Sequence, residues 1–187
     1  DATQITNKTE IIAPNPSFAL YKVYSKIYDL KLKTFNYDNN FNLRVDDIFK
    51  LVSKNTAIVF FTFPNIPVEG NINLSFINKL AKFLSKKKIL LVIDEVYFPF
   101  NKFSSLSLTK KFKNLVVMRS FSKAFGLAGA RIGYMVSENN KIKTFSNTKG
   151  GYETNMLSAA ALEFILDNNI ITKKYTNDVL KGLLFLK

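Results

Sequence analysis

Apolar residues along this chain of 187 residues gather in short runs, which alternate with longer segments of mixed polarity. Several runs are almost continuous in isoleucine, valine, leucine and phenylalanine, which is typical of strands covered on both faces of a sheet. We therefore predict six strands. They lie at Glu10–Ala13, Lys31–Phe35, Ala57–Phe61, Ile89–Asp94, Leu115–Arg119 and Ala130–Val136.

Segments between these runs are predicted to be helices, and Asn73 is suited to cap one of them. The helices are expected at Phe18–Tyr28, Val45–Val52, Leu74–Lys86 and Met156–Asp167. In the last of these, four apolar side chains fall on one face, namely Leu157, Ala160, Ala161 and Phe164. The stretch Val179–Leu186 resembles the start of a further helix. Alternating strands and helices predict an α/β fold with a mostly parallel sheet, and the length fits one domain over residues 1–187.

Composition excludes several classes of function. The chain has no cysteine, which excludes disulfide frameworks and thiolate metal sites. It has no histidine, so neither a zinc enzyme nor a Ser-His-Asp hydrolase fits. No apolar run reaches the ~18 residues that a membrane-spanning helix needs, and the first residues do not resemble a signal peptide. We expect a cytoplasmic protein that binds neither a membrane nor a metal.

The formal net charge of +13 makes nucleic acid a candidate partner. Only three of the 27 basic residues are arginines, however, and arginine is the residue whose planar fork reads bases and phosphates. The lysines are scattered, and no basic stripe is interleaved with aromatic residues. We interpret the charge as a solvated, lysine-rich surface and expect no nucleic-acid partner. A nucleic-acid-binding domain is the alternative, which salt-sensitive retention on DNA would favour.

The segment from Ser120 to Tyr134 is the most specific motif in the chain. It places Lys123 between hydroxyls and small residues and puts Arg131 eight positions later. A lysine amine kept neutral in such a setting can form a Schiff base with a carbonyl cofactor. The hydroxyls of Ser120 and Ser122 and the guanidinium of Arg131 would suit a bound phosphate. Together they predict a site for pyridoxal phosphate, with Lys123 as the catalytic residue.

Two further segments support this prediction. Asp94 ends a predicted buried strand, where ligands of open α/β sheets bind, and an aspartate there can keep a pyridine nitrogen protonated. Tyr97 could donate a hydrogen bond to a phenolate on the same ring. Phe18 opens a predicted helix and is free to lie flat against a planar ligand. Taken singly, Asp94 also reads as a loop cap and Phe18 as ordinary core packing.

In their order along the chain, these residues resemble the fold-type I pyridoxal-phosphate aminotransferases, and within them the histidinol-phosphate aminotransferase-like group. The most specific part of the resemblance is Ser-x-Ser-Lys-x-x-Gly-Leu-Ala-Gly-x-Arg-x-Gly-Tyr. The resemblance covers nearly the whole chain. It implies a three-layer α/β/α large domain in a homodimer. It also implies an enzyme that moves an amino group from an amino acid or phosphorylated amino compound to a 2-oxo acid.

The resemblance also implies a role for each residue at its position in this sequence. Lys123 would carry the Schiff base and shuttle a proton, and Asp94 would pair with the pyridinium. Tyr97 would donate to the phenolic oxygen of the cofactor, and Phe18 would stack on its ring. The phosphate ligands would be Ser120, Ser122 and Arg131.

The sequence departs from the family pattern at the turn around Pro67. The family reads Asn-Pro-Thr-Gly there, whereas this chain has Ile66 at the asparagine position and Glu69 at the glycine position. Asn65 is adjacent, but neighbours on an extended segment point to opposite sides, so we do not expect it to substitute.

Other segments also differ from the family. Gly150–Asn155 departs from the usual histidinol-phosphate pattern, and the family's upstream phosphate loop and downstream small domain are expected to lie outside this chain. These differences keep two alternatives open. One is decarboxylation of a phosphorylated amino acid with the same cofactor, and the other is a non-catalytic fragment that keeps only the fold.

Overall fold

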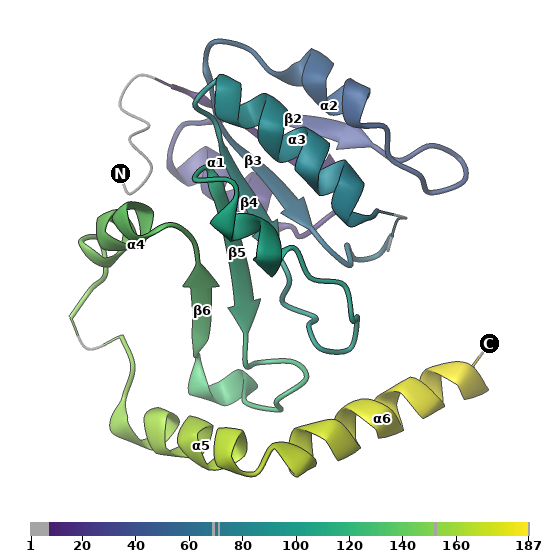
Figure 1. The fold of residues 1–187 in the computed structure, drawn as a ribbon, viewed down its shortest axis with the longest axis vertical. Coiled ribbons are helices and arrows are strands. Elements are labelled where there is room, and N and C mark those ends of the chain that lie inside the picture. The colour runs from purple at the N-terminus through teal and green to yellow at the C-terminus, as the bar shows by residue number, and fades with distance from the viewer. Residues whose placement is uncertain (1–7, 69, 71, 152, 187) are drawn as a thin grey trace.

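The computed structural model describes residues 8–68, 70, 72–151 and 153–186 and shows a single six-stranded sheet with helices on both faces (Figure 1). The strands are β1 (Glu10–Asn15), β2 (Lys31–Asn36), β3 (Thr56–Thr62), β4 (Leu90–Asp94), β5 (Leu115–Ser120) and β6 (Gly133–Val136). Their order in the sheet is β2-β1-β3-β4-β5-β6. Strands β1 to β5 pair in parallel, whereas β6 runs antiparallel to β5. The predicted α/β fold with a mostly parallel sheet is confirmed.

Six α-helices and two short 3-10 helices are present in the described part of the chain. They are α1 (Leu20–Ile27), α2 (Val45–Leu51), α3 (Leu74–Lys86), α4 (Asn139–Ser146), α5 (Met156–Asp167), α6 (Asn169–Phe185), η1 (Leu106–Lys110) and η2 (Ala128–Ala130). Asn73 caps α3 as predicted, because its Oδ1 accepts a hydrogen bond from the backbone N–H of Phe76 at 2.9 Å. Asn155 caps α5 through the N–H of Ser158 at 2.8 Å. These side-chain caps satisfy N–H groups that would otherwise lack a partner at each helix start.

Successive side chains of a strand point to opposite faces of the sheet, so the apolar residues of the central strands form two core clusters, one on each face. On one face, Val59 and its same-side neighbours pack against α2 and α3. On the other face, Ile58 belongs to a second cluster, against which Phe145 of α4 packs. The ring of Tyr21 in α1 lies 4.9 Å from that of Phe60 on this second face. Helices therefore cover both faces, which is the predicted three-layer α/β/α arrangement.

The last predicted strand, Ala130–Val136, is wrong over its first residues. Ala130 belongs to η2, and Arg131 has a left-handed backbone conformation with φ of 56°. The chain therefore turns before β6 begins at Gly133. The backbones of β5 and β6 lie close together at this point, since a Cβ on Gly133 would lie 2.9 Å from the carbonyl oxygen of Arg119.

Other boundaries and one packing expectation also need correction. β4 begins at Leu90 rather than Ile89, and α1 begins at Leu20, so that Phe18 precedes the helix. α5 has the predicted bounds, but its apolar face is not covered, since Leu157 is 83% exposed and Phe164 is 59% exposed. α5 lies beside η2 and is followed end to end by α6, away from the sheet (Figure 1). Helix α4 was not predicted from the sequence. Helix α6 was predicted only from the stretch Val179–Leu186, but it begins at Asn169.

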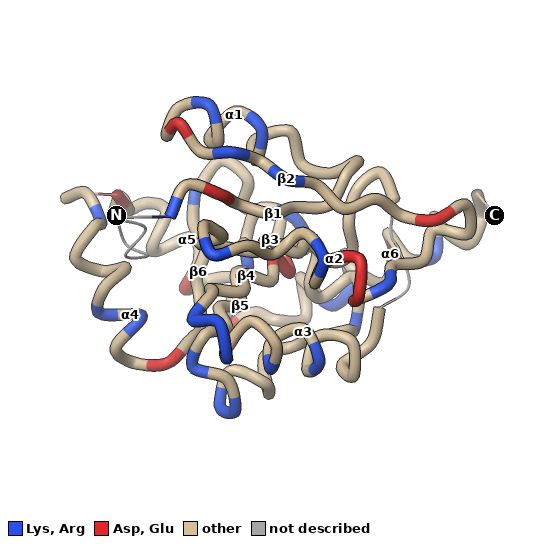
Figure 2. Tube along the Cα trace, turned by 90° about the horizontal axis from the view of Figure 1, so that it is seen from above, with Lys and Arg blue, Asp and Glu red and all other residues tan. Residues whose placement is uncertain are grey.

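Lysine and arginine are spread over several helices and loops rather than gathered in one band (Figure 2). That is the distribution expected of a solvated, lysine-rich surface. In the ranges that the structure describes, no helix is both long enough and apolar enough to cross a bilayer. Glu69 and Tyr152, which entered the comparison with the family pattern, lie outside the described residues.

Candidate functional site

The predicted site residues gather at one edge of the sheet, where the parallel strands end. Asp94 is the last residue of β4, Ser120 is the last residue of β5, and Phe18 follows β1. Because β6 is antiparallel, its first residue, Gly133, pairs with Ser120 and brings Arg131 back to the same edge. Ligands of open α/β sheets bind at this kind of edge. The topology thus brings together residues that are far apart in the sequence.

Asp94 lies between Thr62 of β3 and Met118 of β5 in the register of the sheet. Its Oδ1 accepts a hydrogen bond from the backbone N–H of Val96 at 3.0 Å, so it does cap the following turn. Burial raises the pKa of this carboxyl. The Val96 hydrogen bond opposes that rise, and the negative charge of Glu95 adds to it. A cationic partner such as a protonated ring nitrogen would stabilise the charged form of a carboxyl in this position.

Phe18 is held at the edge by Tyr21 but is not itself buried. It is 56% exposed, and its ring meets the ring of Tyr21 edge-on at 6.2 Å. The hydroxyls of Tyr21 and Thr62 share a hydrogen bond of 2.7 Å, and burial raises the pKa of Tyr21 to about 12. Since Thr62 pairs with Asp94, this contact ties the start of α1 to the end of β4. The exposure favours a stacking surface over ordinary core packing for Phe18.

Lys123 lies in the loop that follows β5. The start of this loop is fixed by a hydrogen bond of 3.0 Å from the backbone N–H of Ser122 to Oγ of Ser120. The Lys123 amine lies 5.6 Å from the centre of the Tyr97 ring, so the loops after β4 and β5 bring these two predicted residues together. The Lys123 side chain is exposed, in contrast to the desolvated setting that the sequence suggested.

Arg131 makes no hydrogen bond with the two serines among the described residues. Its Nη1 donates to the carbonyl oxygen of Ala128 at 3.1 Å, and its side chain is exposed. The structure therefore joins Ser120 and Ser122 by a hydrogen bond but leaves Arg131 apart at the same edge. Separate donors of this kind can converge on one anion without contacting each other.

Asn65 is fully buried and ties two loops of the site together. Its Nδ2 donates to the carbonyl oxygen of Pro16 at 2.7 Å, and its Oδ1 accepts from Oγ of Ser17 at 2.6 Å. Ile66 is 50% exposed. The Asn65 amide is thus committed to the Phe18 loop, as expected if it does not substitute for the family's asparagine.

Sequence reasoning missed a buried ion pair directly behind the site. Nη2 of Arg119 lies 2.8 Å from Oε2 of Glu95, and the side chains are 8% and 1% exposed. Each partner is the sequence neighbour of a predicted site residue, Ser120 and Asp94 respectively. The available signal was a second carboxylate after Asp94 and one of only three arginines just before the serines.

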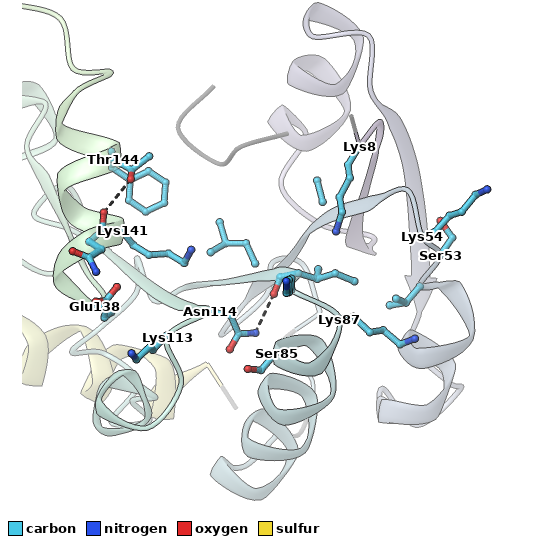
Figure 3. Close-up of a pocket in the computed structure, with 17 residues that line it drawn as sticks. Lys8, Ser53, Lys54, Ser85, Lys87, Lys113, Asn114, Glu138, Lys141 and Thr144 are labelled. Carbon is cyan, nitrogen blue, oxygen red and sulfur yellow. Dashed lines mark hydrogen bonds between the residues drawn. The ribbon is translucent and has the colours of Figure 1, made fainter. Parts of the chain in front are cut away.

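A cleft of about 1000 Å³ lies at the opposite edge of the sheet, near the amino ends of β3, β4 and β5 (Figure 3). It contains none of the predicted site residues. Six lysines are among its lining residues, and Oδ1 of the buried Asn114 has no hydrogen-bond partner within the described ranges. Lysines attract anions whereas an acceptor oxygen repels them, so this lining selects no single ligand.

The side chains at the carboxyl edge fit pyridoxal phosphate. An exposed amine beside a phenol ring provides a nucleophile and a hydrogen-bond donor, and half-buried Asp94 suits a pyridinium nitrogen. The exposed ring of Phe18 offers a flat apolar surface. Two serine hydroxyls and a guanidinium suit the phosphate.

Comparisons with known proteins identify the family to which the chain belongs. The family model for aminotransferase class I and II matches residues 2–184. A histidinol-phosphate aminotransferase of Thermoanaerobacter pseudethanolicus is 36% identical over 177 residues, which are 94% of this chain and 49% of the relative. One of Pelagibacter ubique is 32% identical over 175 residues, covering 91% and 48%. The chain spans about half the length of the curated relatives that it matches.

Solved structures share the fold. L-threonine-O-3-phosphate decarboxylase from Porphyromonas gingivalis matches with a TM-score of 0.74 and 25% identity, over 90% of this chain and 50% of that one. Histidinol-phosphate aminotransferase from Sinorhizobium meliloti, in complex with pyridoxal-5'-phosphate, matches with a TM-score of 0.84 and 20% identity, over 96% and 50%. Together with the family match, these findings show that the chain belongs to the class I and II aminotransferase family, whose members include the histidinol-phosphate aminotransferases that it resembles.

Proposed function

We propose that this chain forms the cofactor-binding part of a pyridoxal-phosphate-dependent aminotransferase. The enzyme moves an amino group between an amino acid, or a phosphorylated amino compound resembling histidinol phosphate, and a 2-oxo acid. The observation that carries the proposal is the Lys123 amine 5.6 Å from the Tyr97 ring, at the edge where β4 ends in Asp94. Histidinol-phosphate aminotransferases among the relatives support the substrate class.

When bound, pyridoxal phosphate supplies an electron sink that stabilises negative charge at the α-carbon of the substrate. Nζ of Lys123 would hold the cofactor covalently, and this amine would accept a proton from the α-carbon of the substrate. The Asp94 carboxylate would pair with the ring nitrogen and favour its protonated form, Tyr97 would donate to the phenolic oxygen, and Phe18 would offer a flat apolar surface to the ring. Ser120, Ser122 and Arg131 would bind the phosphate.

Tyr97 acts without a second donor to the phenolic oxygen in this proposal. Ile66 stands where the family pattern has asparagine, and both ends of the Asn65 amide are used within the fold. The expected consequence is a phenolic oxygen that is less stabilised as an anion than in relatives with the asparagine.

Covalent capture of the cofactor tests the assignment of Lys123. The purified protein is incubated with pyridoxal phosphate, reduced with borohydride and digested, and the modified peptide is identified by mass spectrometry. We expect the adduct on Lys123 and its loss in Lys123→Ala. Lys110→Ala, which removes an exposed lysine at the end of η1, is the matched control and should keep the adduct. A reducible adduct that persists in Lys123→Ala would show that the assignment is wrong.

Decarboxylation of a phosphorylated amino acid is the second candidate, favoured by the likeness to the threonine-phosphate decarboxylase at 25% identity. The same electron sink serves both reactions, so the products must decide. Released 2-oxo acid without carbon dioxide supports transamination, and carbon dioxide without oxo acid supports decarboxylation. Neither product, despite an adduct on Lys123, identifies a chain that keeps the cofactor site without turnover.

We further propose that the full-length protein is a homodimer. The exposed apolar side chains of α5, such as Met156 at 86% and Leu157 at 83%, support an interface on this helix. A monomeric mass in light scattering would contradict it.

A further inference from the structure

A buried ion pair joins the end of β4, which carries Asp94, to the end of β5, which leads into the Lys123 loop. Arg119 donates to Oε2 of Glu95 through Nη2 at 2.8 Å and through Nε at 3.1 Å. The backbone N–H of Glu95 donates to the carbonyl oxygen of Met118 at 2.8 Å. Backbone and side chains thus both connect the end of β4 to the end of β5.

Both carboxylate oxygens of Glu95 are hydrogen-bonded. Oε1 accepts from the N–H and the hydroxyl of Ser105, at 2.6 and 2.7 Å. Arg119 in turn donates to Oγ of Ser104 at 2.7 Å, and its Cζ lies 3.6 Å from the centre of the Phe98 ring. A network in which every member has a partner fixes one geometry, and removing one partner is costly.

Arg119 also balances a negative charge beside Asp94. The charge of Glu95 raises the pKa of Asp94, and a guanidinium bound to Glu95 compensates that charge. Tyr21 of α1, whose pKa of about 12 keeps it neutral, also faces Asp94. The charged or titratable groups around this end of the sheet include Tyr21, Glu95, Tyr97, Arg119, Lys123, Arg131 and Tyr134, whose hydroxyl accepts a hydrogen bond from Nη1 of Arg119 at 3.4 Å.

We propose that Glu95 and Arg119 form a positioning pair for the cofactor, in which Arg119 holds the end of β4 with Asp94 against the start of the Lys123 loop and offsets the Glu95 charge beside Asp94. The pair acts through Asp94 and Ser120 and does not itself touch the reacting atoms. The inference rests on the proposed function, since it concerns how that same site is held ready.

Cofactor affinity as a function of pH tests the pair. Equilibrium dialysis with pyridoxal phosphate from pH 5 to 8 compares the purified wild-type protein with Arg119→Met, which leaves the Glu95 charge uncompensated. We expect affinity at pH 7 to fall at least about tenfold. The acid loss of binding should also begin at a higher pH, because Asp94 takes up its proton earlier when its pKa is raised. An effect on structure alone would lower affinity equally at every pH.

Two companion variants separate charge from geometry. Arg119→Lys keeps the positive charge but not the double contact, so the pH at which binding is lost should return to the wild-type value while affinity stays reduced. Glu95→Gln combined with Arg119→Met removes both charges, and it should also restore that pH without restoring affinity. A shifted pH in either variant would overturn the charge role.

Lys33→Met is the matched control, because it breaks a partly buried ion pair far from the site. Nζ of Lys33 lies 2.7 Å from Oε2 of Glu10, at the amino end of β1. This variant should lose thermal stability and keep wild-type affinity at every pH. Loss of stability in Arg119→Met or Arg119→Lys without any change in affinity would overturn the inference. Absence of cofactor binding in the wild-type protein would instead overturn the proposed function, and this inference with it.

Discussion

Replacing Asn65 with alanine tests whether one buried amide holds the Phe18 loop in place. The Asn65 residue is 0% exposed, and two hydrogen bonds of its side chain reach Pro16 at 2.7 Å and Ser17 at 2.6 Å. Both partners precede Phe18 in the loop after β1. Alanine removes both hydrogen bonds and leaves a small cavity between this loop and the end of β3.

The expected cost follows from the surroundings of the two partners. Each lost hydrogen bond is worth about 1 kcal/mol net. Pro16 is exposed and Ser17 is half-buried, so water can reach both groups and the full penalty for an unpaired buried atom does not apply. With a small cavity term added, we expect the free energy of unfolding to fall by about 2–3 kcal/mol.

Urea denaturation followed by circular dichroism measures this change, with the slope against urea concentration expected to stay the same. Ile66→Ala is the neighbouring control. Since Ile66 is already 50% exposed, this substitution should lower the free energy of unfolding by no more than about 1 kcal/mol. A loss below about 0.5 kcal/mol for Asn65→Ala, which is typical of an ordinary surface change, would refute the role given to the amide.

Two more predictions concern the site edge. Gly133→Ala should cost about 1–3 kcal/mol in urea denaturation, because its Cβ would meet the Arg119 carbonyl oxygen at 2.9 Å. Gly129→Ala, with no atom within 4 Å of the new Cβ, should change little, and equal losses would contradict the close approach. For Tyr21, burial raises the pKa from 10.0 to about 12, so the unfolded chain releases this proton first as pH rises. The wild-type free energy of unfolding should therefore fall more between pH 10 and about 12 than that of Tyr21→Phe, and identical falls would argue against a buried phenol.

The sheet could be predicted from the sequence because each central strand is visible as a local run of apolar residues. A strand buried on both faces reads as a continuous apolar run, as Leu90–Ile93 does, and the structure buries it on both sides. The strand predicted at Ala130–Val136 was wrong over its first residues for a physical reason. These small and apolar residues form a turn through Arg131, whose left-handed backbone conformation is not visible in the pattern of apolar positions. The apolar stripe of α5 predicted a helix correctly, but a stripe does not say what covers it.

The candidate site residues were predicted from a motif, whereas the contacts that hold them in place were not predicted. Lys123, Asp94 and Tyr97 stand in a recognisable order, and the sheet topology brings their loops to one edge. The Glu95–Arg119 pair depends instead on two strands lying side by side, which no local pattern encodes. The same holds for Tyr21 with Thr62 and for Asn65 with Ser17, where partners distant in sequence meet only after folding.

The antiparallel return of β6 also sets the order in which the site can form during synthesis. Phe18 leaves the ribosome early, and its neighbours on β3 and β4 follow. Arg131 reaches the common edge only after β5 has been made and β6 has paired back along it. A nascent chain that stops before Gly133 contains Lys123 and Arg131 but lacks β6, the strand that brings Arg131 back to this edge.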